Sequence, residues 1–95
     1  MKLRFTRRAL RHLDHARAYI DARDPQAANR VIARIADAVE GLRLYPHRGR
    51  PGRIAGTREL VIPGTPYIAA YRIVDDAIEI LAVLHGARRW PSSDL

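Results

Sequence analysis

The chain of 95 residues contains no cysteine, a single lysine and no long apolar run. Without cysteine it forms neither a disulfide nor a thiolate metal site. Its most apolar stretch, AIEILAVL (residues 77–84), is interrupted by Glu79 and is too short to span a bilayer as a helix. Residues 1–14 lack the apolar core of a secretion signal. We therefore expect a soluble cytoplasmic protein that does not act at a membrane.

Acidic side chains are scarce relative to basic ones. Seventeen basic residues stand against ten acidic ones, a formal net charge of +7, and every basic residue except Lys2 is an arginine. The planar guanidinium group stays ionised and binds phosphates and carboxylates through paired hydrogen bonds. This composition predicts an acidic partner: nucleic acid, an acidic protein segment or an anionic surface. The alternative is a genomic base composition that enriches arginine and alanine alike.

The first half of the chain has the apolar periods of one strand and two helices. Residues 2–6 alternate polar and apolar, as in a strand, and Thr6 is placed to cap a helix over residues 7–22. Asp24 and Pro25 predict a second helix start, with the helix running to about Leu44. The expected buried stripes are Leu10, Leu13, Ala16 and Ile20, then Ala28, Val31, Ile32, Ile35, Val39 and Leu42. The short connection predicts an antiparallel helical hairpin.

The second half is rich in branched and aromatic residues, with breakers between the segments. Residues 58–62, 67–74 and 77–85 therefore predict a three-stranded antiparallel meander. In residues 67–74 one face carries Tyr67, Ala69, Tyr71 and Ile73, and the other includes Arg72, which makes that second face the wetter one. The predicted fold is a single α+β domain over residues 1–95. Its order is β-α-α-β-β-β, with the N-terminal strand and helical hairpin packed on a mainly antiparallel sheet whose other face is open.

The segment YPHRGRPGR, residues 45–53, is basic, lacks acids and is broken by proline and glycine. Arginines in this loop, in the meander and after its last strand are expected to converge on one side of the sheet. Tyr67, Tyr71 and Trp90 would lie nearby and stack on bases or side chains. The alternative is a solvated arginine surface. The cationic candidates are Arg48, Arg50, Arg53, Arg58, Arg72, Arg88 and Arg89.

Other chemistries find little support in the sequence. His12 and His15 share a helix face, but the further ligands of a zinc site are missing, so they are expected to be solvated. No phosphate-binding glycine motif is present, and we predict neither a metal nor a cofactor. Ser92 and Ser93 lie near the end of the chain, without a base nearby in the predicted fold. The acids look structural: Asp14, Asp21, Asp24, Asp37, Glu40, Asp75 and Asp76.

The order of elements and the stretches YPHRGRPGRIAGTRELVIPGTPYIAAYRI and IEILAVLHGARRWP resemble the RelE/ParE family of toxins from bacterial type II toxin–antitoxin systems. The likeness covers nearly the whole chain. Its most specific pieces are GTREL, the Pro66-Tyr67 strand start, Tyr71-Arg72 and the Leu-His-Gly-Ala-Arg run of residues 84–88. The resemblance implies the RelE/ParE toxin fold and a cognate antitoxin whose C-terminal segment wraps around the toxin. It also implies that operator DNA is bound only indirectly, through the antitoxin.

The resemblance implies one of two activities. RelE-like members cut mRNA on the ribosome with arginine, lysine and tyrosine groups, whereas ParE-like members inhibit DNA gyrase without hydrolysis. Here Ile68 occupies a position where RelE-like members commonly have arginine, and no tyrosine follows Tyr71. Cleavage would depend on Arg58, Arg72, Arg88 and His85 as catalytic groups.

We therefore expect a ParE-like inhibitor of gyrase that is not an enzyme. The alternatives are a ribosome-dependent mRNA endonuclease and a non-toxic relative that only binds its antitoxin. If the protein inhibits gyrase, the expected target-binding residues are Arg48, Arg50, Arg53, Arg88, Arg89 and Trp90.

Overall fold

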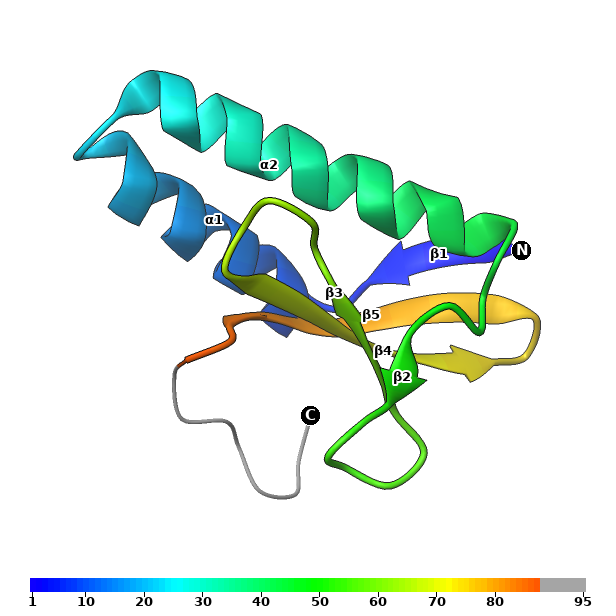
Figure 1. The fold of residues 1–95 in the computed structure, drawn as a ribbon. Helices are drawn as coiled ribbons and strands as arrows, with labels where there is room; N and C mark the ends of the chain where they lie inside the picture. The colour runs from blue at the N-terminus through cyan, green and yellow to red at the C-terminus, as the bar shows by residue number, and fades with distance from the viewer. Residues whose placement is uncertain (88–95) are drawn as a thin grey trace.

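The computed structural model describes residues 1–87 and places two helices on one face of a five-stranded sheet (Figure 1). The elements are β1 (Lys2–Phe5), α1 (Arg7–Asp21), α2 (Pro25–Glu40), the 3-10 turn η1 (Gly41–Arg43), β2 (Arg50–Pro51), β3 (Arg58–Val61), β4 (Tyr67–Val74) and β5 (Ala77–His85). The strand order is β1-β5-β4-β3-β2, with β1 parallel to β5 and the other pairs antiparallel. The predicted α+β fold is confirmed, with the short β2 added inside the basic loop.

Capping side chains set both helix starts. The Thr6 hydroxyl accepts a hydrogen bond from the Ala9 amide at 3.1 Å, and the Asp24 carboxylate accepts from the Gln26 and Ala27 amides. Helix α2 ends at Glu40 instead of continuing to Leu44. The chain tightens into η1 after Gly41, which buries Leu42 and leaves Leu44 in solvent. Glycine favours this end because it is a poor helix former.

The helical hairpin packs on the sheet through small residues of α1 and large residues of α2. Ile35, Val39 and Leu42 are buried as predicted. The prediction for Leu10 is wrong, because Leu10 is 49% exposed and the neighbouring Ala9 is fully buried instead. Ala9 and Ala16 lie two turns apart on the same face of α1, and side chains of this size let a helix approach a sheet closely.

The two faces of the sheet differ as Arg72 indicated. Tyr67, Ala69 and Tyr71 belong to the core under the helices, whereas Arg72 is exposed on the opposite face. That second face is not fully open, since Ile68, Ala70 and Ala82 on it are buried. In the described part of the chain, no helix has the length and apolarity to cross a membrane.

Candidate functional site

The basic loop is anchored to the core by Tyr71 of β4. The fully buried Tyr71 hydroxyl donates to the Pro46 carbonyl at 2.7 Å and accepts from the Gly49 amide at 2.9 Å. Desolvation raises the pKa of Tyr71, against the smaller opposing effects of the Gly49 hydrogen bond and the Arg58 charge. The phenol therefore stays protonated and uses its donor and an acceptor site at once.

Close packing around Gly49 fixes the same loop sterically. A Cβ atom at this position would lie 2.6 Å from Cε1 of Tyr71, which is closer than real contacts allow. Arg58 at the start of β3 donates from Nη1 to the Gly49 carbonyl at 2.7 Å and, more weakly, to the His47 carbonyl at 3.4 Å. The loop before β2 therefore has one defined shape, set by side chains of β3 and β4.

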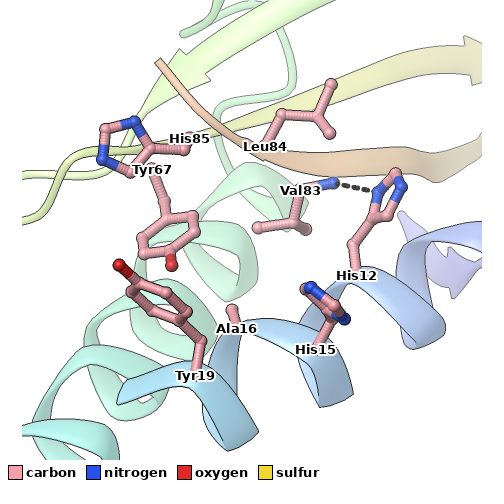
Figure 2. A pocket seen from close by; sticks show the side chains of 8 residues that line it. All are labelled: His12, His15, Ala16, Tyr19, Tyr67, Val83, Leu84 and His85. Atoms are coloured by element: carbon pink, nitrogen blue, oxygen red, sulfur yellow. Dashed lines mark hydrogen bonds between the residues drawn. The ribbon is translucent and has the colours of Figure 1, made fainter. Parts of the chain in front are cut away.

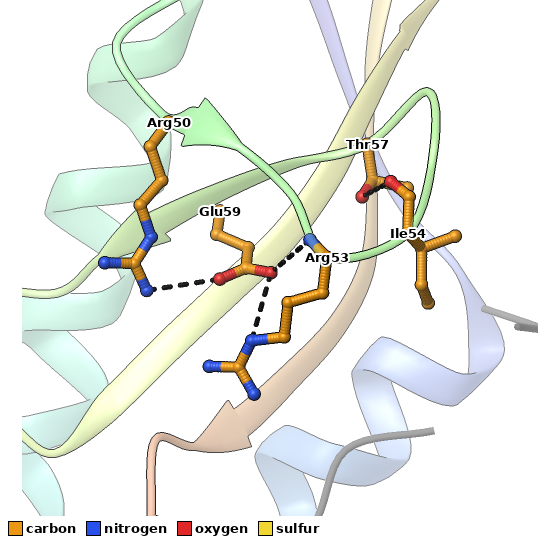
Figure 3. Close-up of polar contacts among 5 residues, drawn as sticks. All are labelled: Arg50, Arg53, Ile54, Thr57 and Glu59. Atoms are coloured by element: carbon orange, nitrogen blue, oxygen red, sulfur yellow. Dashed lines mark hydrogen bonds and ion pairs between the residues drawn. The ribbon is translucent and has the colours of Figure 1, made fainter. Parts of the chain in front are cut away.

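A buried carboxylate organises two of the candidate arginines. Glu59 of β3 is 3% exposed, and its Oε1 accepts from Nη2 of Arg50 at 3.2 Å. Its Oε2 accepts from the Arg53 amide at 2.8 Å and pairs with Nε of Arg53 at 3.5 Å (Figure 3). Both arginine side chains remain about half exposed. This Arg–Glu–Arg group, formed by Arg50, Glu59 and Arg53, orients two guanidinium ions and keeps one net positive charge.

The turn that follows is closed by its own hydrogen bonds. The Gly52 amide donates to the Thr57 carbonyl at 2.8 Å. The Thr57 hydroxyl donates to the Ile54 carbonyl at 2.6 Å, as Figure 3 shows. The Thr57 side chain occupies the space where a Cβ atom of residue 52 would lie, so Gly52 is required there. This turn brings Arg53 back toward Glu59.

A second carboxylate is shared in the same way on the face of the sheet opposite the helices. Glu79 lies across from Arg72 of β4 on one side and Arg4 of β1 on the other. Arg72 binds it from Nε at 2.7 Å, and Nη2 of Arg4 is 3.7 Å away. Ala70 pairs with Glu59 in the same sheet, so both Arg–Glu–Arg groups lie on this face. The face therefore has a positive excess arranged around two fixed acids.

The structure separates the remaining candidates. Arg48 lies over the Tyr45 ring at 4.7 Å from its centroid; it lines one hollow together with Arg50 and Glu59 but forms no ion pair with that carboxylate. His85 accepts the Ala87 amide at Nδ1 and makes an edge contact with the Tyr67 ring, 5.7 Å between centroids. The expectation of an aromatic stacking surface is wrong for Tyr67 and Tyr71, because both face the helices and are buried. Arg88, Arg89 and Trp90 lie outside the described residues.

His12 joins α1 to β5 and is not simply solvated, as the sequence suggested. Its Nδ1 accepts the Val83 amide at 3.1 Å, in a hollow of about 70 Å³ that His15, Tyr19, Tyr67 and His85 also line (Figure 2). Burial lowers the pKa of His12, and the charges of Arg8, Arg11 and His15 lower it further. No group of three or more potential metal ligands occurs within residues 1–87. His12 is a structural bridge.

Comparison with known proteins identifies the class to which this protein belongs. Both the fold and the sequence are those of toxins from type II toxin–antitoxin systems. The model of the family described as "ParE toxin of type II toxin-antitoxin system, parDE" matches residues 3–90. The chain belongs to this ParE toxin family.

Individual relatives agree with that assignment. The protein Y4kP of Sinorhizobium fredii is 56% identical over 90 residues, covering 95% of this chain and 93% of the relative. Toxin RelE2 of Caulobacter vibrioides is 39% identical over 84 residues, with 88% and 93% covered. A chain of the chromosomal ParDE system of Pseudomonas aeruginosa superposes with a TM-score of 0.82 at 27% identity, covering 90% of this chain and 95% of that one. A chain of the Escherichia coli RelBE toxin–antitoxin complex has a TM-score of 0.50 at 16% identity, with 93% and 98% covered, a likeness of fold alone.

Proposed function

We propose that this protein is a ParE-like toxin that inhibits DNA gyrase by binding it, and that a cognate antitoxin neutralises it. The observation that carries the proposal is the family match across residues 3–90. The ParDE chain of P. aeruginosa, similar over 95% of its length, comes from a toxin–antitoxin system, which supports an antitoxin as partner.

The engagement of the candidate catalytic groups supports binding over RNA cleavage. A general acid or base needs a polar atom that reaches the substrate. The Tyr71 hydroxyl is buried and hydrogen-bonded to the loop, and Arg58 is directed at loop carbonyl oxygens. Arg72 is paired with Glu79, and Nδ1 of His85 is occupied by the Ala87 amide. Catalysis through Tyr71 or Arg58 would therefore require these contacts to break first.

The positive charge of the molecule favours acidic surfaces on both proposed partners, the target and the antitoxin. Arg48, Arg50 and Arg53 are exposed, and we assign them to target binding together with Arg88, Arg89 and Trp90. An acidic antitoxin segment would neutralise the net charge of +7 and cover a large surface. Operator DNA would then be contacted through the antitoxin, in the cytoplasm.

An experiment with purified components tests the target. The chain, refolded free of antitoxin, is added to gyrase and relaxed plasmid, and supercoiling and cleaved-DNA complexes are measured. We expect lost supercoiling, accumulated cleavage complexes and reversal by the cognate antitoxin, which we expect the neighbouring gene to encode. Unchanged gyrase activity would contradict the proposal.

The second candidate function is mRNA cleavage, favoured by the 39% identity to a relative named toxin RelE2. Induction of the chain without antitoxin, followed by sequencing of mRNA 5′ ends, distinguishes the two. Filamentation and a DNA-damage response with intact mRNA support gyrase as target, whereas codon-linked cuts support the endonuclease. Normal growth of the induced cells would indicate a non-toxic relative that only binds antitoxin.

A further inference from the structure

Exposed apolar side chains lie just after the end of α2 and at the outer edge of β3, on either side of Arg48. Leu44 is 80% exposed, Tyr45 58% and Val61 49%, whereas most large apolar side chains of residues 1–87 are buried or partly buried. Arg48 lies between them and lines two hollows of about 430 and 400 Å³. Tyr45 and Leu44 line the first hollow, and Val61 lines the second. We name Leu44, Tyr45, Arg48 and Val61 the Leu44 patch.

Hydrogen bonds of the backbone and of Tyr71 hold the loop that carries Leu44, Tyr45 and Arg48. The Tyr45 amide donates to the Gly41 carbonyl and the Arg48 amide to the Tyr45 carbonyl, each at 3.1 Å. Pro46, which follows Tyr45, is held through its carbonyl oxygen, which accepts a hydrogen bond from the Tyr71 hydroxyl. A preordered loop loses little conformational entropy when a partner binds, and aromatic and arginine side chains on such loops are the usual binding hot spots.

The charges around the Leu44 patch favour an acidic partner. Within residues 1–87 no carboxylate forms an ion pair with Arg48, whose guanidinium group lies over the Tyr45 ring. Glu59 also lines the second hollow, but Arg50 and Arg53 both pair with it. The hollows therefore present a cation that has no carboxylate partner among the described residues, between apolar side chains.

The side chains of the patch fit a protein better than a nucleic acid. Leu44 and Val61 are aliphatic and offer no ring on which a base stacks, and the Tyr45 ring is already faced by Arg48. Bulky aliphatic residues of a peptide would instead bury the exposed surface of Leu44 and Val61.

We propose that the Leu44 patch docks an acidic segment of the cognate antitoxin, with an apolar side chain against Leu44 and Val61 and a carboxylate on Arg48. This inference rests on the proposed function, because it takes the antitoxin as the partner. It adds the place of contact and the chemistry of the segment that binds there.

A matched pair of double variants tests the proposal. Leu44→Ser with Arg48→Glu alters the patch, and Leu10→Ser with Arg7→Glu makes the same changes on exposed residues of α1. The probe is the antitoxin encoded beside the gene, titrated against each refolded variant by calorimetry. We expect the patch variant to bind about tenfold or more weakly and the α1 variant to stay within about twofold of the wild type. Unfolding curves confirm that both variants remain folded.

Hydrogen exchange of the unaltered complex provides a second measurement. Bound antitoxin should slow exchange of the amides of residues 44, 45, 47, 48 and 61 more than those of residues 7–14. Equal binding by both variants, or protection that omits the patch, would overturn the docking site and leave the toxin–antitoxin function standing. A patch variant that keeps antitoxin binding but loses gyrase inhibition would also overturn it. Wild-type protein that binds no antitoxin would refute the proposed function as well.

Discussion

The Tyr71 hydroxyl lies 2.9 Å from the Gly49 amide nitrogen and joins the buried centre of β4 to the basic loop. Replacing Tyr71 by Phe keeps the ring but leaves the Gly49 amide and the Pro46 carbonyl without this partner. We expect the free energy of unfolding to fall by about 1–3 kcal/mol. Urea unfolding measures it, and hydrogen exchange should show faster exchange at residue 49. Tyr45→Phe is the control, since the Tyr45 side chain is exposed. Equal stability of the two variants would show that the hydroxyl does not hold the loop.

Glu59 sets the geometry of Arg50 and Arg53, so its removal should affect stability and anion binding in opposite directions. Glu59→Ala removes a buried acceptor, and we expect a loss of about 1–3 kcal/mol. The released guanidinium groups should bind polyanions more tightly, measured as elution from heparin at higher salt. Glu40→Ala is the matched control because it removes the same charge from the exposed pair with Arg43. Equal elution of the two variants would mean that net charge alone governs the binding.

The sequence predicted the elements well and the polar contacts poorly. Asp24 and Pro25 were sufficient to place the start of α2, because a cap acts on amides two and three residues away. Leu10 was misplaced because the sequence pattern favours leucine over its neighbour Ala9, whereas close helix–sheet packing selected the smaller side chain.

The role of Glu59 was missed because the pairing of β2 with β3 brings its arginine partners to it. This two-residue strand lies in a segment rich in proline and glycine, where no strand was predicted. One signal was available, since Glu59 is the single acid between Glu40 and Asp75 in a strongly basic stretch. The Leu44 patch had no such signal. The exposure of Leu44 results from the 3-10 turn over Gly41–Arg43, which helical periodicity does not predict.

The hydrogen bond from the Val83 amide to Nδ1 of His12 should make the stability of the fold depend on pH. Burial lowers the pKa of His12 in the folded protein, so the unfolded chain takes up its proton at higher pH, near the ordinary value of about 6.5. Stability contributed by neutral His12 is complete above that pH and is lost as the pH falls toward the lowered pKa. A proton on Nδ1 would also replace the acceptor that Val83 uses.

The measurement is the free energy of unfolding at pH 7.5 and 5.5. We expect the wild type to lose more stability on acidification than His12→Phe, which has no imidazole to protonate. His15→Phe, altered at an exposed position of the same helix, should retain most of the wild-type pH dependence, because it removes only the smallest of the effects that lower the pKa of His12. An identical pH dependence in the wild type and His12→Phe would exclude His12 as its source.

The turn between β4 and β5 stores strain that a single substitution should release. Asp75 and Asp76 both have positive φ, 50° and 61°, in the two-residue connection of this hairpin. Such turns favour glycine at the second position, because an L side chain there crowds the backbone. We expect Asp76→Gly to raise the free energy of unfolding by up to about 1 kcal/mol, measured by urea unfolding, because the left-handed conformation costs an L side chain about 1–2 kcal/mol and the backbone entropy of glycine offsets part of that gain. Asp76→Ala removes the same charge but keeps a Cβ atom, so it should bring no such gain. Equal stabilisation by both variants would assign the effect to the lost carboxylate instead of the backbone.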